Sequence, residues 1–337
     1  MLSLSFTRHL AASFALCAAA VPATAQTGRS DPLNAGPMVG AVDMREASIW
    51  VQTQQSASVS VACWPQDNPA NRLESPTAAT SVASNLTATL RLGPLTPGTT
   101  YAYEVAVDGQ TLDLPYATAF ETPPDFRDKF PPPNFTVAVG GGHYVNDRPF
   151  DPLNRVPGDG YEIFGAILEK QPHLMLWLGN TVHLREADWY SRSGLADRYR
   201  RGREIPALQP LLGSVPHVAT WSAHDYGPAN ANRRYIGKQW VHELFQQYWP
   251  NPTHGITGDI PGVATRLRWS DVDIFLLDDR YHRDLTAKPP SRRTVYGPEQ
   301  LDWLLDALAA SPASFKLVCT GSPVLNPAEH PDNFSAA

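Results

Sequence analysis

Apolar and polar residues alternate with a period of two through much of residues 36–122. The pattern is clearest at Val59–Cys63 and at Tyr101–Val107. Because successive side chains of a strand point to opposite faces, this spacing predicts half-buried strands. The Asp108-Gly109 pair that follows is a hairpin signal. Residues 31–122 therefore predict a small all-β sandwich of fibronectin or immunoglobulin type, for which the simplest role is that of a structural spacer.

The pattern changes after residues 123–134, which are rich in proline and which we interpret as a stiff linker. Beyond the linker, short apolar runs alternate with segments of helical spacing. We expect strands at 135–139, 174–178, 217–221, 272–277 and 315–318, and helices at 161–170, ending near Leu212, and starting near Pro298. This order predicts an α/β domain with a layered sheet over residues 135–337, whose functional residues lie just beyond the strand ends.

The first 25 residues have the features of a signal peptide. Arg8 precedes an apolar run from Leu10 to Val21, and Ala23 and Ala25 form the small-x-small pattern that signal peptidases cleave. The run is too short to cross a membrane comfortably, and no later segment is long enough. We expect a periplasmic or secreted protein without a membrane span, the alternative being an uncleaved anchor.

Charge and cysteine content narrow the partners. The 337 residues carry a formal net charge of −6, spread evenly, so we expect no nucleic-acid partner. Cys63 and Cys319 lie in strand-like segments, where we expect small buried side chains, with neither a disulfide nor a zinc site required. The arginine run from Arg198 to Arg203 is typical of a solvated helix end, although it could also contact a phosphate.

Polar loops follow the first three strands of the α/β domain. They comprise Gly140–His143, Gly179–His183 and Ser222–Tyr226. The stretches 177–186, 221–228, 276–281, 297–301 and 315–318 resemble signature segments of the PhoD-like alkaline phosphatases (alkaline phosphatase D), a family of the metallophosphoesterase superfamily. The resemblance runs from about residue 36 to the end of the chain.

The resemblance implies a metallophosphoesterase fold and hydrolysis of phosphate monoesters and diesters. It also implies an iron ion and one or two calcium ions between the strand ends. Such a cluster acts as a Lewis acid and activates water. Clustered cations require anionic ligands to offset their charge, and calcium in particular requires oxygen ligands.

Most of the family's metal ligands are replaced in this chain. Gly142 stands where the family has an iron-binding cysteine, Asn180 where it has the bridging aspartate, and Ala223 where it has an aspartate. Only His224 and Asp225 match the third motif. The family pattern then continues to a Gly-Asp-Arg-His segment that would lie beyond the last residue, so the resemblance implies a C-terminally truncated chain.

These substitutions predict an impaired phosphoesterase, a pseudoenzyme for which we expect no cofactor. We identify His224 and Asp225 as the candidate catalytic residues, and Asn180, His183 and His143 as the remnants of the metal site. One alternative is an active phosphoesterase whose histidines and aspartate form a rebuilt zinc site. Others are a non-catalytic binding protein and an incomplete gene product, whose exposed sheet edge would make it prone to aggregate. Pairing with a second chain that completes the sheet is also left open. A small phosphate ester is the expected ligand.

Two further features of these loops have plain interpretations. Ser222 with His224 and Asp225 has the residue types of a catalytic triad, but close neighbours on one loop rarely stack in a line. His143 and His183 are typical of solvent-facing loop histidines, and His224 of a structural hydrogen bond beneath its loop. The Asp278-Asp279-Arg280 segment predicts an internal ion pair.

Overall fold

The computed structural model describes residues 32–147, 151, 160–256, 260–285, 288–289 and 292–324. The predicted signal peptide, residues 1–25, lies outside the described residues. The rest of the chain from Pro32 onward clusters as one compact unit. No helix within the described ranges is long and apolar enough to cross a membrane.

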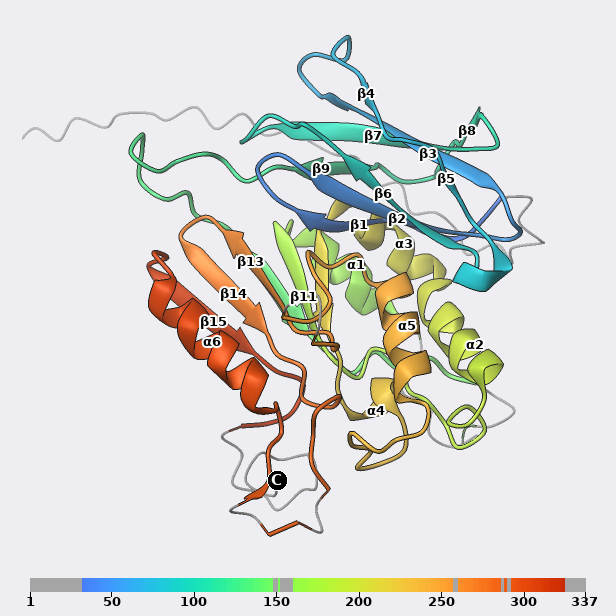
Figure 1. The fold of residues 1–337 in the computed structure, drawn as a ribbon. Helices are drawn as coiled ribbons and strands as arrows, with labels where there is room; N and C mark the ends of the chain where they lie inside the picture. Colours follow the sequence, from blue (N-terminus) through green and yellow to red (C-terminus); the bar gives the residue numbers. More distant parts are fainter. Residues whose placement is uncertain are drawn as a thin grey trace, which may run out of the picture. The chain divides into compact units, whose positions relative to one another are not determined.

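The N-terminal strands form two antiparallel sheets (Figure 1). One has the order β1-β2-β6, and the other the order β4-β3-β7-β8, with β5 beside β3 and β9 beside β7. Their bounds are β1 Leu33–Val42, β2 Ala47–Thr53, β3 Ser58–Pro65, β4 Leu73–Glu74, β5 Ala78–Ala79, β6 Thr87–Leu92, β7 Thr100–Val107, β8 Gln110–Thr111 and β9 Ala119–Glu121, with the short helix η1 at Val82–Ser84. The all-β N-terminal region is thus as predicted, because alternate residues of β3 and β7 are buried.

The α/β region contains two three-stranded sheets. In the first, β10 (Val137–Gly140), β11 (Leu174–Leu178) and β12 (His217–Thr220) are parallel. In the second, β14 (Val272–Leu276) pairs in antiparallel fashion with β13 (Thr265–Trp269) and in parallel with β15 (Phe315–Cys319). The predicted strands are confirmed within a few residues, whereas β13 was not predicted.

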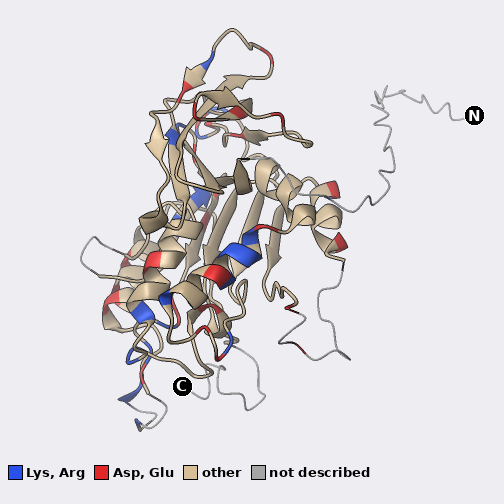
Figure 2. Cartoon of the chain, turned by 90° about the vertical axis from the view of Figure 1, so that its right-hand side faces the viewer, with Lys and Arg blue, Asp and Glu red and all other residues tan. Residues whose placement is uncertain are grey.

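Helices cover these sheets on both sides (Figure 1). Their bounds are α1 Glu162–Glu169, α2 Arg192–Arg203, η2 Pro206–Leu208, α3 Gln209–Ser214, α4 Ala223–Tyr226, α5 Lys238–Tyr248 and α6 Pro298–Ala310. Helix α6 lies along the sheet of β13, β14 and β15, and the other helices lie on the side of β10, β11 and β12. Positively and negatively charged segments are interspersed along these helices and loops, whereas the N-terminal strands carry few charges (Figure 2).

The N-terminal sheet and the helices share one hydrophobic core. Trp50 of β2 is fully buried with Tyr248 of α5, their ring centroids 5.6 Å apart, and its indole N–H donates to the carbonyl of Gln247 at 2.6 Å. Across the other sheet, the Tyr103 hydroxyl donates to the Gly213 carbonyl of α3 at 2.9 Å. Because burying large aromatic side chains contributes strongly to stability, the N-terminal strands help to fix α3 and α5.

The last strand leaves an apolar edge exposed. Within the described chain β15 pairs only with β14. Phe315 of β15 and Leu305 of α6 are both 64% exposed. An edge strand of this kind can pair with another chain. A second chain that completes the sheet stays a prediction.

The arginine run does not form the solvated helix end that we predicted. Arg198 is buried and pairs with Asp188 at 3.0 Å and with Asp147 at 3.2 Å. Arg203 is buried with its guanidinium 3.8 Å from the ring centroid of Trp249. The prediction was wrong because α2 packs against α5, and the side of α2 that carries Arg198 and Arg203 is buried.

His217 provides a test of this core. It is fully buried at the start of β12, where its Nδ1 accepts a hydrogen bond from Trp177 Nε1 at 2.9 Å and its Nε2 donates to the Leu211 carbonyl at 3.1 Å. Burial lowers the pKa of His217 to about 3. In the unfolded chain a histidine has a pKa near ~6.5, so between these two values only the unfolded state takes up the proton.

We therefore predict that stability is fully present above pH 6.5 and falls as the pH drops toward 3. The contribution of one such histidine is about 1.4 kcal/mol per pH unit. The variant His217→Gln keeps a donor and an acceptor but cannot take up this proton. Its unfolding free energy should therefore fall less steeply with decreasing pH than that of the parent, by about 1.4 kcal/mol per pH unit. Urea unfolding at several pH values between 7 and 5 measures both slopes. Parallel curves for the two proteins would contradict this assignment.

Candidate functional site

The loops after β10, β11 and β12 meet at one edge of their sheet, as predicted. The parallel register pairs Gly140 with Trp177 and Leu178 with Thr220, which places the three strand ends side by side. The first two loops are joined directly, because the amide of Gly142 donates to the Gly179 carbonyl at 3.1 Å. The sites predicted just beyond the strand ends are therefore neighbours in space.

Asp225 connects the second and third loops. Its buried carboxylate accepts hydrogen bonds from the amides of Thr181 (2.7 Å), Val182 (2.8 Å) and Ser222 (2.8 Å), from the amide of Asn180, and from the Thr181 hydroxyl at 2.9 Å. Burial raises the pKa of this carboxyl, and the hydrogen bonds act in the opposite direction. Both oxygens are thus engaged in holding the loops together.

Asn180 and Gly179 make the close approach of the loops feasible. A Cβ atom on Gly179 would lie 2.5 Å from Ser222, and the φ of +83° favours glycine. Asn180 follows in the left-handed region with a φ of 52°, and its Oδ1 accepts a hydrogen bond from the amide of His224 at 3.1 Å. The candidate metal ligand Asn180 is therefore part of the hydrogen bonding between the loops.

His183 and His224 lie together. Their rings are stacked, with centroids 4.8 Å apart and an interplanar angle of 23°. His183 Nδ1 is 3.1 Å from the His143 carbonyl, and its ring also contacts Tyr144. Burial and the nearby His224 lower the pKa of His183 to about 4, so its imidazole is neutral at pH 7. The side chain of His224 is exposed.

The side chain of His143 has a different environment. Its ring contacts Phe164, Tyr161 and Trp177, with centroid distances of 5.1, 6.1 and 6.3 Å. Both ring nitrogens are buried, and neither has a hydrogen-bond partner within the described part of the chain. Burial, with the charges of Arg203 and His183, lowers the pKa of His143 to about 3.

The plain interpretations of these histidines were therefore reversed. His143, which we expected to face solvent, has buried ring nitrogens, and His183 is half-buried. His224, which we expected beneath its loop, is exposed. The sequence could not show this, because the burial of His143 depends on aromatic residues from α1 and β11, which are distant along the chain.

The donors at the strand ends do not fit a cluster of iron and calcium. Asp225 uses both oxygens for hydrogen bonds, and Ala223 and Gly142 have no ligand atom in their side chains. The described residues contain no group of three or more His, Cys, Asp or Glu that could hold a metal ion. Clustered cations require several anionic oxygen or sulfur ligands, and this set provides at most one.

The sequence interpretation missed an ion-pair framework behind the first loop. Arg185 pairs with Asp151 at 2.6 Å, and the Tyr144 hydroxyl donates to the same carboxylate at 2.7 Å.

The internal ion pair predicted for the Asp278-Asp279-Arg280 segment is confirmed, since Arg280 Nε lies 3.4 Å from Asp279 Oδ1. Ser222 is the N-cap residue of α4, and its amide donates to the Asp225 carboxylate at 2.8 Å.

The burial expected for both cysteines is confirmed for Cys63 and not for Cys319. Cys63 and Cys319 are free, the first buried and the second half-buried. Burial raises the pKa of both thiols to about 11, so neither provides a thiolate at neutral pH.

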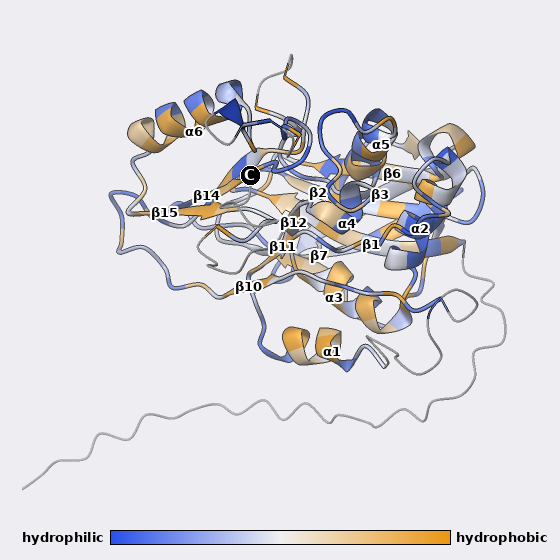
Figure 3. Ribbon diagram, turned by 90° about the horizontal axis from the view of Figure 1, so that it is seen from below, coloured by the Kyte–Doolittle hydropathy of each residue, from blue (hydrophilic) through white to orange (hydrophobic). Residues whose placement is uncertain are grey.

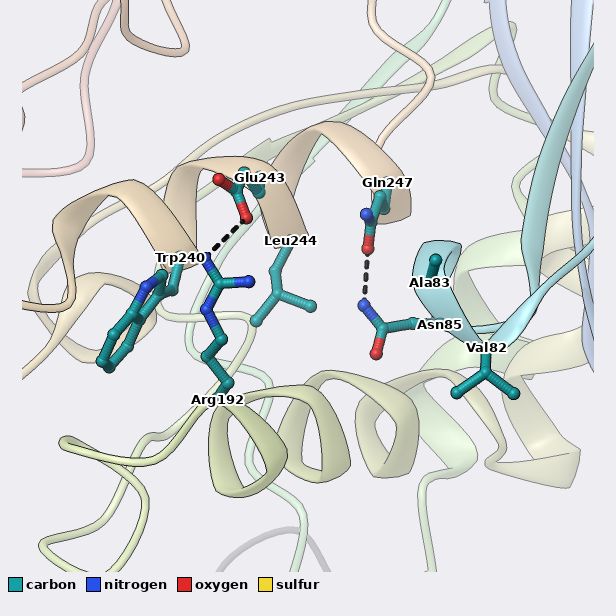
Figure 4. Close-up of a pocket in the computed structure, with 8 residues that line it drawn as sticks. All are labelled: Val82, Ala83, Asn85, Arg192, Trp240, Glu243, Leu244 and Gln247. Carbon is teal, nitrogen blue, oxygen red and sulfur yellow. Dashed lines mark hydrogen bonds and ion pairs between the residues drawn. The ribbon is translucent and has the colours of Figure 1, made fainter.

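A cavity of about 240 Å³ between η1 and α5 carries several polar groups (Figure 4). Asn85 donates to Gln247 at 2.6 Å, and Arg192 pairs with Glu243 at 3.5 Å while its guanidinium lies 5.3 Å from the Trp240 ring centroid. Because these groups pair with one another, the cavity is explained by contacts that join the N-terminal region and α2 to α5.

Comparison with known proteins extends this picture. Residues 30–124 match the model of a family described as a domain of unknown function, DUF7800. No curated protein matches the chain. Among solved structures, that of PhoD superposes with a TM-score of 0.69 and 16% sequence identity, covering 90% of this chain and 64% of PhoD. The purple acid phosphatase PPD1 from yellow lupin (Lupinus luteus) seeds gives a TM-score of 0.54 and 12% identity over 81% of this chain and 48% of that enzyme.

These similarities establish the fold. The chain has a fold similar to that of PhoD, with mixed sheets, helices and an all-β region at its N-terminus. It spans less than two thirds of the length of PhoD and about half that of the lupin phosphatase. At such low identity the superposition transfers no residue role.

The importance of Asp225 can be tested by one substitution. Asp225→Asn replaces an acceptor oxygen with an N–H donor that faces backbone N–H groups, so we expect a loss of about 3 kcal/mol of unfolding free energy. Asp302→Asn, which makes the same chemical change on the exposed face of α6, should stay within about 0.5 kcal/mol of the parent. Equal urea midpoints for the two variants would show that the hydrogen bonds of Asp225 do not hold the loops.

Proposed function

We propose that this protein is an exported homologue of the PhoD-like phosphatases whose catalytic centre is impaired, so that it binds ligands without efficient hydrolysis. The hydrogen bonding of Asp225 is the observation that carries the proposal. The two loops that should present metal ligands instead direct backbone amides at one carboxylate. A carboxylate whose oxygens already accept several hydrogen bonds has little capacity to bind a cation.

Charge supports the same conclusion. At the strand ends Asp225 is the single acidic side chain among the candidate residues, beside Asn180, His183 and His224. Clustered cations in such a set would lack charge compensation, and their affinity would be low. In this proposal the N-terminal region is a fibronectin-like or immunoglobulin-like spacer, and the protein acts in the periplasm or outside the cell.

The proposal predicts no metal-dependent turnover. Purified protein should contain only substoichiometric iron, calcium and zinc by mass spectrometry, and should not hydrolyse p-nitrophenyl phosphate or bis(p-nitrophenyl) phosphate above the rate without protein. A catalytically active PhoD, assayed in the same buffers, is the positive control. Stoichiometric metal together with turnover that a chelator abolishes would contradict the proposal.

A second candidate is a phosphoesterase with a rebuilt zinc site. The observation in its favour is the stacked pair of His183 and His224 on adjacent loops, because a neutral imidazole is a good zinc ligand. It would need a third ligand in addition to this pair.

The two candidates predict different responses to zinc titration. If the centre is impaired, calorimetry should give the same weak binding for the parent protein and for the double variant His183→Ala/His224→Ala. If a zinc site exists, the double variant should lose it, and His173→Ala, at the opposite end of β11, should not. Loss of tight zinc binding in the double variant alone would favour the rebuilt site.

A further inference from the structure

A second cavity lies beside the edge strand β10. Its volume is about 660 Å³, and its walls come from β10, the glycine-rich loop after it, α1 and β11. Helix α1 packs against α3 and η2, and its residues 162–164 and 167 line this space. Hydrophobic residues of α1 are visible on the outer side of the molecule in Figure 3. The volume lies within the range of cavities that hold small organic ligands.

The walls of this cavity are mainly apolar and aromatic. Phe164, Met175 and Trp177 are buried and line it. Val139 and Ile163 also line it, and they are 57% and 61% exposed. Exposed large apolar side chains around an aromatic cavity are typical of a ligand site.

His143 supplies the polar group of this cavity. It lines the cavity, and both of its buried ring nitrogens lack a hydrogen-bond partner in the described part of the chain. Leaving a buried polar group unpaired is costly, and a native structure retains such a group only for a reason. The pocket between η1 and α5 differs, because its polar groups pair with one another.

The charge of the lining indicates the class of ligand. Glu162 is the acidic residue among those that line the cavity, and no lysine or arginine is among them. Without a cationic side chain in the lining, this carboxylate disfavours an anion, so a phosphate ester is a poor occupant. The aromatic walls favour a flat apolar ring.

We propose that this cavity binds a small neutral molecule that has a flat apolar ring and one hydrogen-bonding group, with the ring against Phe164 and Trp177 and the polar group on His143. His224 and Asp225 are not among the residues that line this cavity, and the proposed binding does not depend on whether the protein hydrolyses phosphate esters.

The probe for this site is 2-naphthol, which is neutral at pH 7 and carries one hydroxyl group. Calorimetry with the purified protein should detect its binding, and binding of 2-naphthoate, the anionic analogue, should be weaker by at least about tenfold. His143→Phe keeps an aromatic ring at this position and removes both nitrogens. It should weaken the binding of 2-naphthol about tenfold and leave the binding of naphthalene unchanged. A variant that binds 2-naphthol as well as the parent does would overturn the role of His143.

A second variant tests the location without altering a buried residue. Ile163→Arg adds a long charged side chain at the exposed rim and should abolish binding of 2-naphthol. Leu305→Arg makes the same change at a similarly exposed position of α6 and should have no effect. Failure of the parent protein to bind 2-naphthol, or equal binding by these two variants, would overturn the proposal. Neither outcome affects the metal and hydrolysis measurements.

Discussion

The structure of the strand-end region depends on the hydrogen bonds of one buried carboxylate. Asp225, at the start of a short helix after β12, accepts hydrogen bonds from its own loop at Ser222 and from the neighbouring loop at Asn180–Val182. The backbone amides would otherwise be buried donors without partners. A side chain that performs this task cannot also provide free oxygens to a cation. The same interaction therefore fixes the loops and argues against a metal cluster.

The scaffold around these loops holds them in place from both sides. The N-terminal strands pack Trp50 against Tyr248 of α5, and β10–β12 share a hydrophobic core with strands of the N-terminal sheets and of the second α/β sheet. Arg198 adds a buried ion-pair network with Asp188 next to the loop after β11. These contacts hold the strand-end loops within a fold that superposes on that of PhoD.

Local patterns in the sequence predicted most of the strands. The period of two in β3 and the apolar runs of β11 and β14 were sufficient, because burial there follows directly from spacing. Strand β13 was missed since its charged residues Arg266 and Arg268 pair with Asp273 of β14, a contact that spacing does not show. The loops were correctly placed just beyond the strand ends. Two features could not be predicted: that both carboxylate oxygens of Asp225 accept hydrogen bonds, and that the ring of His143 is buried. Both depend on partners from other loops and helices.

The central claim is that hydrogen bonds, and not a metal ion, hold the strand-end loops. It is tested most directly by the unfolding free energy of the purified protein before and after exhaustive dialysis against a chelator. A metal ion that binds only the folded state stabilises it, and removal of the ion abolishes that contribution to the unfolding free energy. The account predicts the same unfolding free energy in both samples. A marked loss of stability in the chelated sample that iron, calcium or zinc restores would contradict it.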